Sequence, residues 1–190
     1  MADVIVPADN SVRGQPLPLP VTAERLLLRR LAPGDWKDLM ECLKEAEEDN
    51  IIRWLESDGH VRLTTPGQPF CLGVELRDGG KLIGYLSLNF TDDERLQATV
   101  SFQFNPNYQQ NGFPGEALDA LLGFCFEGVK LHRLSSRCFS ADAEGCKTLE
   151  EAGLRREGEF LKDTRSPEGW LNSIWYALLD EEYLARPPAS

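Results

Sequence analysis

Apolar residues recur along this chain at two spacings, and these spacings predict where strands and helices lie. Between residues 96 and 104, apolar positions alternate with polar ones, which is typical of a strand with one buried face. Between residues 36 and 43, apolar side chains recur at the three- and four-residue steps of one helix face. The two patterns predict strands at 26–31, 70–76, 81–90, 96–104, 132–139, 154–161 and 170–179, and helices at 36–43, 51–55, 115–129 and 142–152.

The turns between these elements predict how the strands pair. Asp78-Gly79-Gly80 joins two strands, which favours an antiparallel hairpin because glycines accept the positive φ of tight turns. The strand–helix–strand step across residues 96–139 instead implies one parallel step. We therefore expect an α+β (mixed α/β) fold: a mixed, mostly antiparallel twisted sheet of about seven strands with helices on both faces.

The two ends of the chain differ from its middle. Prolines alternate with leucines up to residue 20, which predicts an extended, proline-rich arm over residues 1–21. Residues 22–185 have the length and periodicity of a single domain. Residues 186–190 are expected to form a short tail. An extended arm suits contacts with a neighbouring subunit, so a homodimer stays open as an expectation.

The 190 residues carry a net charge of −11, and this charge limits the partners. A surface of this sign repels a phosphate backbone, so we expect no nucleic acid partner. The same surface attracts a cationic substrate such as an amine. The negative charge can also serve only to keep the protein soluble, and composition does not distinguish between the two interpretations.

The cysteines and the apolar runs indicate a reducing, aqueous compartment. The five cysteines are odd in number and lack a C-x-x-C pair, and only two histidines accompany them, so we expect no metal site. Several cysteines lie among apolar residues, as small core side chains do. No charged and then apolar leader follows Met1, and no apolar run is long enough to cross a membrane. We therefore expect a cytoplasmic protein without a membrane partner.

A polar loop runs directly into the helix predicted at 115–129. The loop contains Gly112, and Pro114 suits the first helical turn, where its missing N–H costs least. Such a junction points several backbone N–H groups and the positive end of the helix dipole at one spot. We therefore expect the junction to hold a phosphate group.

Four stretches of the chain resemble the GNAT superfamily of acyl-CoA-dependent N-acyltransferases. They are residues 22–31, 107–133, 142–158 and 175–183, so the similarity extends over most of the chain. The branch that they resemble most is the Rim type, which includes acetyltransferases of ribosomal-protein N-termini. The resemblance implies an N-acetyltransferase with acetyl-CoA as co-substrate. It also implies that the acetyl group passes to a small-molecule or peptide amine by direct attack in a ternary complex.

The resemblance also implies where the cofactor binds. The family's loop pattern maps onto residues 109–114, so the loop backbone is expected to bind the diphosphate of CoA. A backbone N–H near Phe104 and Asn105, where two central strands separate, is expected to meet the oxyanion. Asp142 is expected to lie near the pantetheine. The expected cofactor-binding residues are therefore Phe104, Asn105, Gln109, Gln110, Asn111, Gly112, Phe113, Gly115 and Asp142.

Several positions depart from the family pattern and keep a second interpretation open. Gln110 and Asp142 replace a usual glycine and asparagine, and Pro114 has no N–H to donate. Gly145 replaces a serine proposed to protonate the leaving thiolate, and Thr99 replaces a glutamate base, so the catalytic residues stay unassigned. The alternative is a non-catalytic GNAT-fold binding or scaffolding protein with weakened or lost CoA binding. The acceptor stays open between a peptide α-amine, a polyamine and an amino sugar. Further residues considered for proton transfer, and expected to be structural, are Ser101, Glu75, Asn172 and Tyr176.

Overall fold

The computed structural model describes residues 11–12, 15–16, 19–43, 46–56, 69–92, 94 and 96–186. Its strands are β1 (Ser11–Val12), β2 (Gln15–Pro16), β3 (Val21–Thr22), β4 (Leu26–Arg30), β5 (Phe70–Leu76), β6 (Leu82–Phe90), β7 (Gln97–Phe104), β8 (Arg133–Phe139), β9 (Arg155–Ser166) and β10 (Gly169–Leu179). Its helices are η1 (Pro33–Asp35), α1 (Trp36–Cys42), α2 (Glu48–Glu56), η3 (Pro106–Asn111), α3 (Phe113–Gly123), η4 (Phe124–Val129), α4 (Ala143–Glu151) and α5 (Asp180–Leu184).

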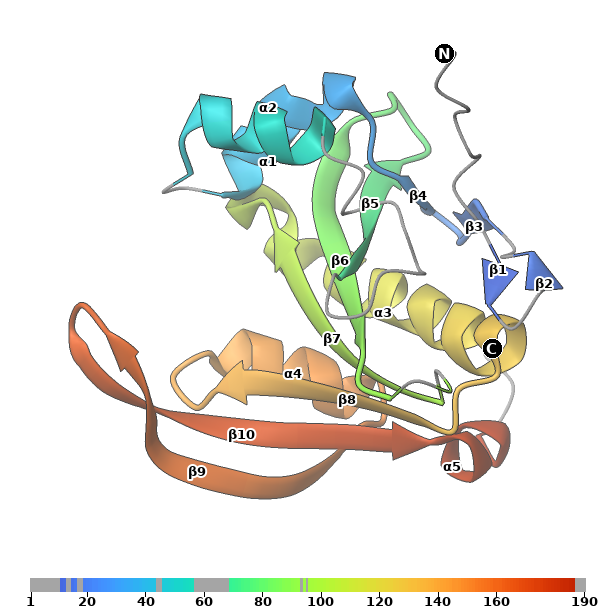
Figure 1. Cartoon of the computed structure of the whole chain (residues 1–190), viewed down its shortest axis with the longest axis vertical. Coiled ribbons are helices and arrows are strands. Elements are labelled where there is room, and N and C mark those ends of the chain that lie inside the picture. Colours follow the sequence, from blue (N-terminus) through green and yellow to red (C-terminus); the bar gives the residue numbers. More distant parts are fainter. Residues whose placement is uncertain are drawn as a thin grey trace, which may run out of the picture.

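An eight-stranded sheet in the order β3-β4-β5-β6-β7-β8-β10-β9 forms the centre of the molecule (Figure 1). All neighbouring strands in it are antiparallel except β7 and β8, which are parallel, so the predicted mixed, mostly antiparallel fold is confirmed. The sheet exceeds the expected seven strands because Val21–Thr22 pairs with β4 and extends the edge. That pairing takes the last residue of the expected arm into the sheet. Residues 1–10 of the arm and 187–190 of the tail lie outside the described residues.

Two clusters of buried side chains form the core, one on each face of the sheet. On one face, Leu118 and Leu121 of α3 pack with Val100 of β7, and we call this the α3 face. On the opposite face, Leu39 of α1 packs with Leu82 of β6, and we call this the α1 face. α4 lies on β8 next to α3, whereas α1 and α2 lie together over the first half of the sheet (Figure 1).

Two helices differ from their predicted extents for identifiable reasons. The helix predicted at 115–129 begins at Phe113 and changes from α to π winding at Phe124. The three successive residues from Phe124 to Phe126 are all buried. One face of a regular α-helix cannot bury three residues in a row, and the wider π turn accommodates them. The helix predicted at 51–55 begins earlier, at Glu48, because the positive end of a helix favours carboxylates in its first turn.

No helix in the described ranges is long and apolar enough to span a membrane. Within the same ranges, no group of three or more His, Cys, Asp or Glu side chains is placed to hold a metal ion. All five cysteines are free, and four of them are buried, in line with their interpretation as small core side chains. The fifth, Cys146, is partly exposed.

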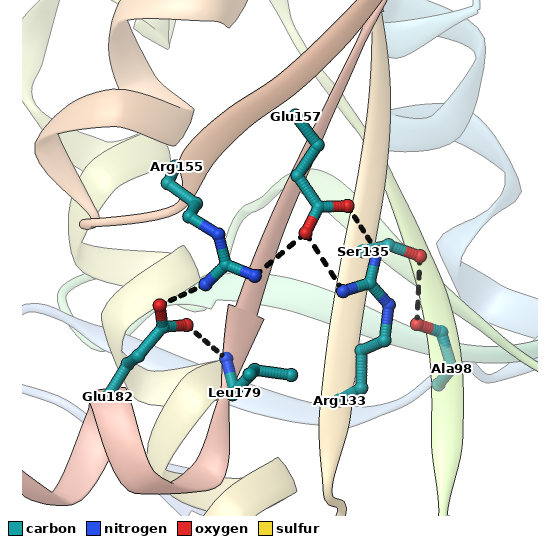
Figure 2. A network of polar contacts seen from close by, with 7 residues as sticks. All are labelled: Ala98, Arg133, Ser135, Arg155, Glu157, Leu179 and Glu182. Atoms are coloured by element: carbon teal, nitrogen blue, oxygen red, sulfur yellow. Dashed lines mark hydrogen bonds and ion pairs between the residues drawn. The ribbon is translucent and has the colours of Figure 1, made fainter.

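β7 and β8 pair at one end and separate at the other. Their parallel ladder joins residues 97–100 to residues 133–136 and ends there. Across this paired end, Ser135 Oγ donates to the Ala98 carbonyl at 3.4 Å (Figure 2). Beyond it the two strands diverge, and we call the space between their last residues the opening. The opening is the feature of the fold that positions the candidate site.

An ion-pair network covers the paired end (Figure 2). Both Nη groups of Arg133 donate to the Glu157 carboxylate, Nη1 at 3.0 Å. Arg155 donates to the same carboxylate at 2.8 Å and also pairs with Glu182. The other oxygen of Glu182 accepts the Leu179 N–H at 2.8 Å. The network therefore ties β8, β9, β10 and α5 together where β7 and β8 are still paired.

Glu157→Gln is expected to lower the free energy of unfolding near neutral pH by up to about 1 kcal/mol, because the pairs are partly exposed. Arg133 lowers the pKa of Glu157. The stabilisation is therefore fully present above the ordinary glutamate pKa of about 4.3 and is lost as the pH falls through the lowered value. Acid unfolding followed by circular dichroism should show the two curves converging at low pH. Curves that stay equally far apart down to the lowest pH would contradict this account.

Candidate functional site

A cleft of about 480 Å³ lies at the opening on the α3 face. Residues 102–104 of β7 form one wall, and Asp142 and Glu144 at the start of α4 form the opposite wall. Gln109 and Pro114 close the end that faces α3. The cleft is therefore bounded by the end of β7 and by the start of both helices on this face.

The segment between β7 and α3 is wound into the 3₁₀ helix η3 rather than left as an open loop. A 3₁₀ helix pairs its N–H groups with carbonyls three residues back, and the Tyr108 N–H donates to the Asn105 carbonyl at 2.9 Å. The amides of this turn are therefore largely used within it, which differs from the expected open loop. Pro106 at the first position and Asn105 as N-cap favour the winding, since the Asn105 Oδ1 accepts the Asn107 N–H at 3.0 Å.

The start of α3 keeps backbone donors for an anion. Gly112 is the N-cap with φ +74°, and its carbonyl accepts the Glu116 N–H at 3.1 Å. Pro114 has no N–H, so Phe113 and Gly115 are the first-turn amides without a partner inside the helix. A Cβ added at Gly115 would meet no atom within 4 Å, so the space beside it is open. The start of α3 therefore offers an anion fewer backbone N–H groups than the open loop predicted from the sequence would offer.

Arg25 contacts both the end of η3 and the start of α3, a role that was not predicted from the sequence. Its Nε and its backbone N–H both donate to the Glu116 carboxylate at 2.6 Å. Its Nη1 donates to the Asn111 carbonyl at 3.1 Å, and its guanidinium lies 4.4 Å from the centre of the Phe113 ring. Arg25 is distant in sequence from all of these partners, so no local signal could have identified it. It holds the turn and the first turn of α3 to the start of β4.

The structure corrects one of the two residues expected to stabilise the oxyanion, Asn105. Its N–H donates to the Ile83 carbonyl at 2.8 Å, so it is committed to β6. Hydrogen-bonded and non-hydrogen-bonded pairs alternate along an antiparallel ladder. Phe104, which pairs with Gly84, therefore directs its N–H away from β6 and into the opening. Of the two expected residues, Phe104 is the one whose N–H can meet an oxyanion.

Asp142 is the N-cap of α4. Its Oδ1 accepts the Gly145 N–H at 2.9 Å. A Cβ at Gly145 would lie 2.9 Å from Asp142 Cγ and 3.0 Å from Cys138 Sγ, so a larger residue would have to displace its neighbours. Burial raises the pKa of the Cys138 thiol. This wall of the cleft is therefore formed by a close-packed helix start with a neutral thiol behind it.

The structure separates the expected cofactor residues into three groups. Phe104, Gln109 and Asp142 line the cleft. The Gln109 Nε2 also donates to the Phe104 carbonyl at 3.2 Å, which fixes the turn to the end of β7. Asn105 does not line the cleft, and it hydrogen-bonds Ile83 and Glu41 instead. The remaining expected residues follow one another along the turn and the start of α3, and they are Gln110, Asn111, Gly112, Phe113 and Gly115.

Three of the residues considered for proton transfer have structural contacts instead. Glu75 pairs with Arg29 at 2.5 Å. Asn172 accepts a backbone N–H at 2.9 Å across a bulge of β9. Tyr176 is 1% exposed and donates to Glu150 at 2.9 Å, and burial raises its pKa. The fourth residue, Ser101 of β7, is exposed. Its hydroxyl is a much weaker base than a carboxylate or an imidazole.

Comparison with known proteins gives one consistent result. Residues 25–155 match the family model described as an acetyltransferase (GNAT) domain. The chain is 28% identical over 171 residues to YnaD of Bacillus subtilis (strain 168), an uncharacterized N-acetyltransferase, with 86% of this chain and 98% of that protein covered. A GNAT-family acetyltransferase from Bacillus anthracis is 26% identical with a TM-score of 0.75, over 86% of this chain and 100% of that one. A chimera of the spermidine N-acetyltransferase SpeG from Vibrio cholerae and hSSAT has the same fold, at 20% identity and a TM-score of 0.75, over 86% of this chain and 100% of the chimera.

Proposed function

The chain belongs to the GNAT acetyltransferase family, and on that premise we propose that it transfers an acetyl group from acetyl-CoA to a primary amine by direct attack in a ternary complex. The observation that carries the proposal is the cleft at the opening, with the start of α3 at one end and the Phe104 N–H at the other. One end suits a diphosphate and the other suits a developing oxyanion.

Three parts of acetyl-CoA have residues that fit them, namely the diphosphate, the pantetheine chain and the thioester. The amides of Phe113 and Gly115, with the positive end of α3, would hold the diphosphate. The edge of β7 and Asp142 would line the pantetheine chain. The Phe104 N–H would stabilise the oxyanion as the amine nitrogen attacks the thioester carbonyl carbon. The carbon–nitrogen bond then forms, and the carbon–sulfur bond breaks to release the thiolate of CoA.

Within the family we propose the Rim-type branch, on the residues 22–31, 107–133, 142–158 and 175–183 that resemble it. The acceptor is then a small-molecule or peptide amine. The net charge of −11 supports an acceptor that arrives as a cation. The relative with spermidine N-acetyltransferase in its name supports a cationic amine as a chemical class compatible with this fold.

One observation favours a second candidate, a non-catalytic protein on the same fold. The winding of η3 uses amides that an open loop would present, and Pro114 removes another donor. Such a protein would bind acetyl-CoA weakly or not at all. Steady release of CoA with any amine would exclude this candidate.

Calorimetric titration of acetyl-CoA tests the proposed function, and Asp142→Asn sharpens it. We expect the wild-type protein to bind, and Asp142→Asn to bind about three- to tenfold more tightly, because one negative charge leaves a cleft that receives an anion. The asparagine oxygen can still accept the Gly145 N–H, so the cap of α4 is kept.

Glu181→Gln is the matched control, because it removes the same charge from an exposed position on α5. Its acetyl-CoA affinity should equal that of the wild type. Absence of wild-type binding at millimolar acetyl-CoA would overturn the proposed function. Equal gains in affinity for both variants would show that Asp142 acts only through the overall charge.

A further inference from the structure

Side chains at the end of β7 also lie on the α1 face, on the other side of the sheet from the cleft. Side chains alternate along a strand, so Phe104 lies in the core of the α3 face while Gln103 and Asn105 point to the α1 face. There the Gln103 Nε2 donates to the Cys42 carbonyl at 3.3 Å, and the Asn105 Nδ2 donates to Glu41 Oε2 at 2.7 Å. The last turn of α1 is thereby tied to the end of β7, beside the opening.

Asn105 is buried, and every polar group of its side chain and backbone is engaged. It is 1% exposed. Its Oδ1 accepts the Asn107 N–H at 3.0 Å, and its backbone bonds Ile83 and Tyr108. The remaining group, Nδ2, has Glu41 as its partner. A buried amide held at every other atom has one orientation available, so it fixes where the Glu41 carboxylate lies.

Glu41 keeps both exposure and negative charge. Its side chain is 50% exposed. Lys81 Nζ lies 3.0 Å from Glu41 and 2.9 Å from Asp38, so two carboxylates share one ammonium and one negative charge remains. The C-terminal end of α1 adds the negative end of its dipole. A carboxylate offers about four acceptor positions, and the contacts with Lys81 and Asn105 use three of them.

β8 ends in an aromatic side chain on the same face, with an arginine beside it. Phe139, the last residue of β8, follows Cys138, which lies in the core of the α3 face, so Phe139 points to the α1 face. It is 39% exposed, and Arg137 lies 5.7 Å from the centre of its ring. The α1 face therefore has a carboxylate at the end of β7 and an aromatic ring at the end of β8, the two strands that separate at the opening.

We propose that Glu41 binds the acceptor ammonium and accepts its proton, and that Asn105 positions Glu41 for this step. The proposal rests on the proposed function, which brings the thioester to the opening from the α3 face. The acceptor it names is a primary amine that arrives protonated, with an apolar group near the nitrogen. Glu41 takes one proton from the ammonium and passes it to solvent. The neutral amine attacks the thioester carbon, the carbon–sulfur bond breaks, and a second proton from the nitrogen goes to the CoA thiolate.

The test compares acceptors that differ in charge, with full-length protein saturated with acetyl-CoA. 2-Phenylethylamine, 1,5-diaminopentane and a tetrapeptide with a free α-amine are protonated near neutral pH, whereas 2,2,2-trifluoroethylamine is mostly neutral. Glu41→Gln should lower kcat/KM tenfold or more for the protonated acceptors and less than twofold for the neutral one. Asn105→Asp, which sets a second carboxylate against Glu41, should give a similar loss. Adding Glu41→Gln to Asn105→Asp should lower kcat/KM no further, because the two residues act as one unit.

Glu56→Gln, at the exposed end of α2, is the matched control for charge and should behave as the wild type. The acetyl-CoA affinity of Glu41→Gln should match the wild type, and its Tm should fall only slightly, because Lys81 keeps Asp38 as a partner. Equal losses on charged and neutral acceptors would reveal a structural role and overturn the proposal. So would a wild-type protein that binds acetyl-CoA but transfers acetyl to no protonated amine. Failure to bind acetyl-CoA at all would instead remove the proposed function itself.

Discussion

Gly112→Val is expected to weaken acetyl-CoA binding tenfold or more. Gly112 has φ +74°, a conformation that a β-branched residue adopts only under strain. Its carbonyl accepts the Glu116 N–H at 3.1 Å, the bond that begins α3. Rotation that relieves the strain would break this bond and turn the Phe113 and Gly115 amides away from the anion. Strain of about 1–3 kcal/mol is enough, since about 1.4 kcal/mol corresponds to a tenfold change.

Calorimetric titration of acetyl-CoA measures this change, and Gly79→Val is its matched control. Gly79 also has a positive φ, +84°, and a side chain there would meet no atom within 4 Å. It lies in the turn between β5 and β6, outside both α3 and the lining of the cleft. Both variants should lose stability, but only Gly112→Val should lose affinity. Equal affinities would show that Gly112 does not shape the anion site.

Gly84→Val is expected to cause the largest loss of stability, about 3 kcal/mol, or a fall in Tm of roughly 6–12 °C. Gly84 lies opposite Phe104 in the β6–β7 pair. A Cβ at Gly84 would lie 2.6 Å from the Gln103 carbonyl oxygen and 2.7 Å from Phe104 Cδ1. The ring can rotate away, but the carbonyl oxygen moves only if β7 moves. Because β7 forms one wall of the cleft, the variant should lose acetyl-CoA binding as well.

Scanning calorimetry with a graded series checks the prediction. Gly84→Ala should fall between the wild type and Gly84→Val, because it introduces the same first atom without the branching. Gly34→Val is the control, since a Cβ at Gly34 meets no atom within 4 Å. A Tm for Gly84→Val equal to that of Gly34→Val would mean that β6 and β7 do not approach as closely as the structure has them.

The parts of the fold that follow from near neighbours in the chain could be predicted. The alternation along β7 identifies its buried face, with Ala98, Val100 and Phe104 in the core. The capping role of Asp142 is also local, because a capping side chain accepts from an amide only three residues away. The winding of η3 escaped prediction, although Pro106 and Asn105 supply signals that favour it.

The candidate site could be predicted only in part. The place of the candidate cleft follows from the order of elements, because a parallel step between two strands in a mixed sheet creates the place where they separate. The contacts that brace the cleft do not follow. Arg25 meets Glu116 across 91 residues, and Asn105 meets Glu41 across 64 residues. In the sequence each of these is an ordinary charged or polar residue.

The periods of strands and helices, the hairpins, the helix caps and the surplus of negative charge can all be read from the amino-acid order, because they depend on neighbouring residues or on simple sums. Three features required the folded chain: which N–H groups lack a partner at the start of α3, the direction of the Phe104 N–H into the opening, and the contact of a carboxylate of α1 with Asn105. The physical reason is that strand order and register bring distant residues within hydrogen-bonding distance, and a linear pattern carries no record of that distance.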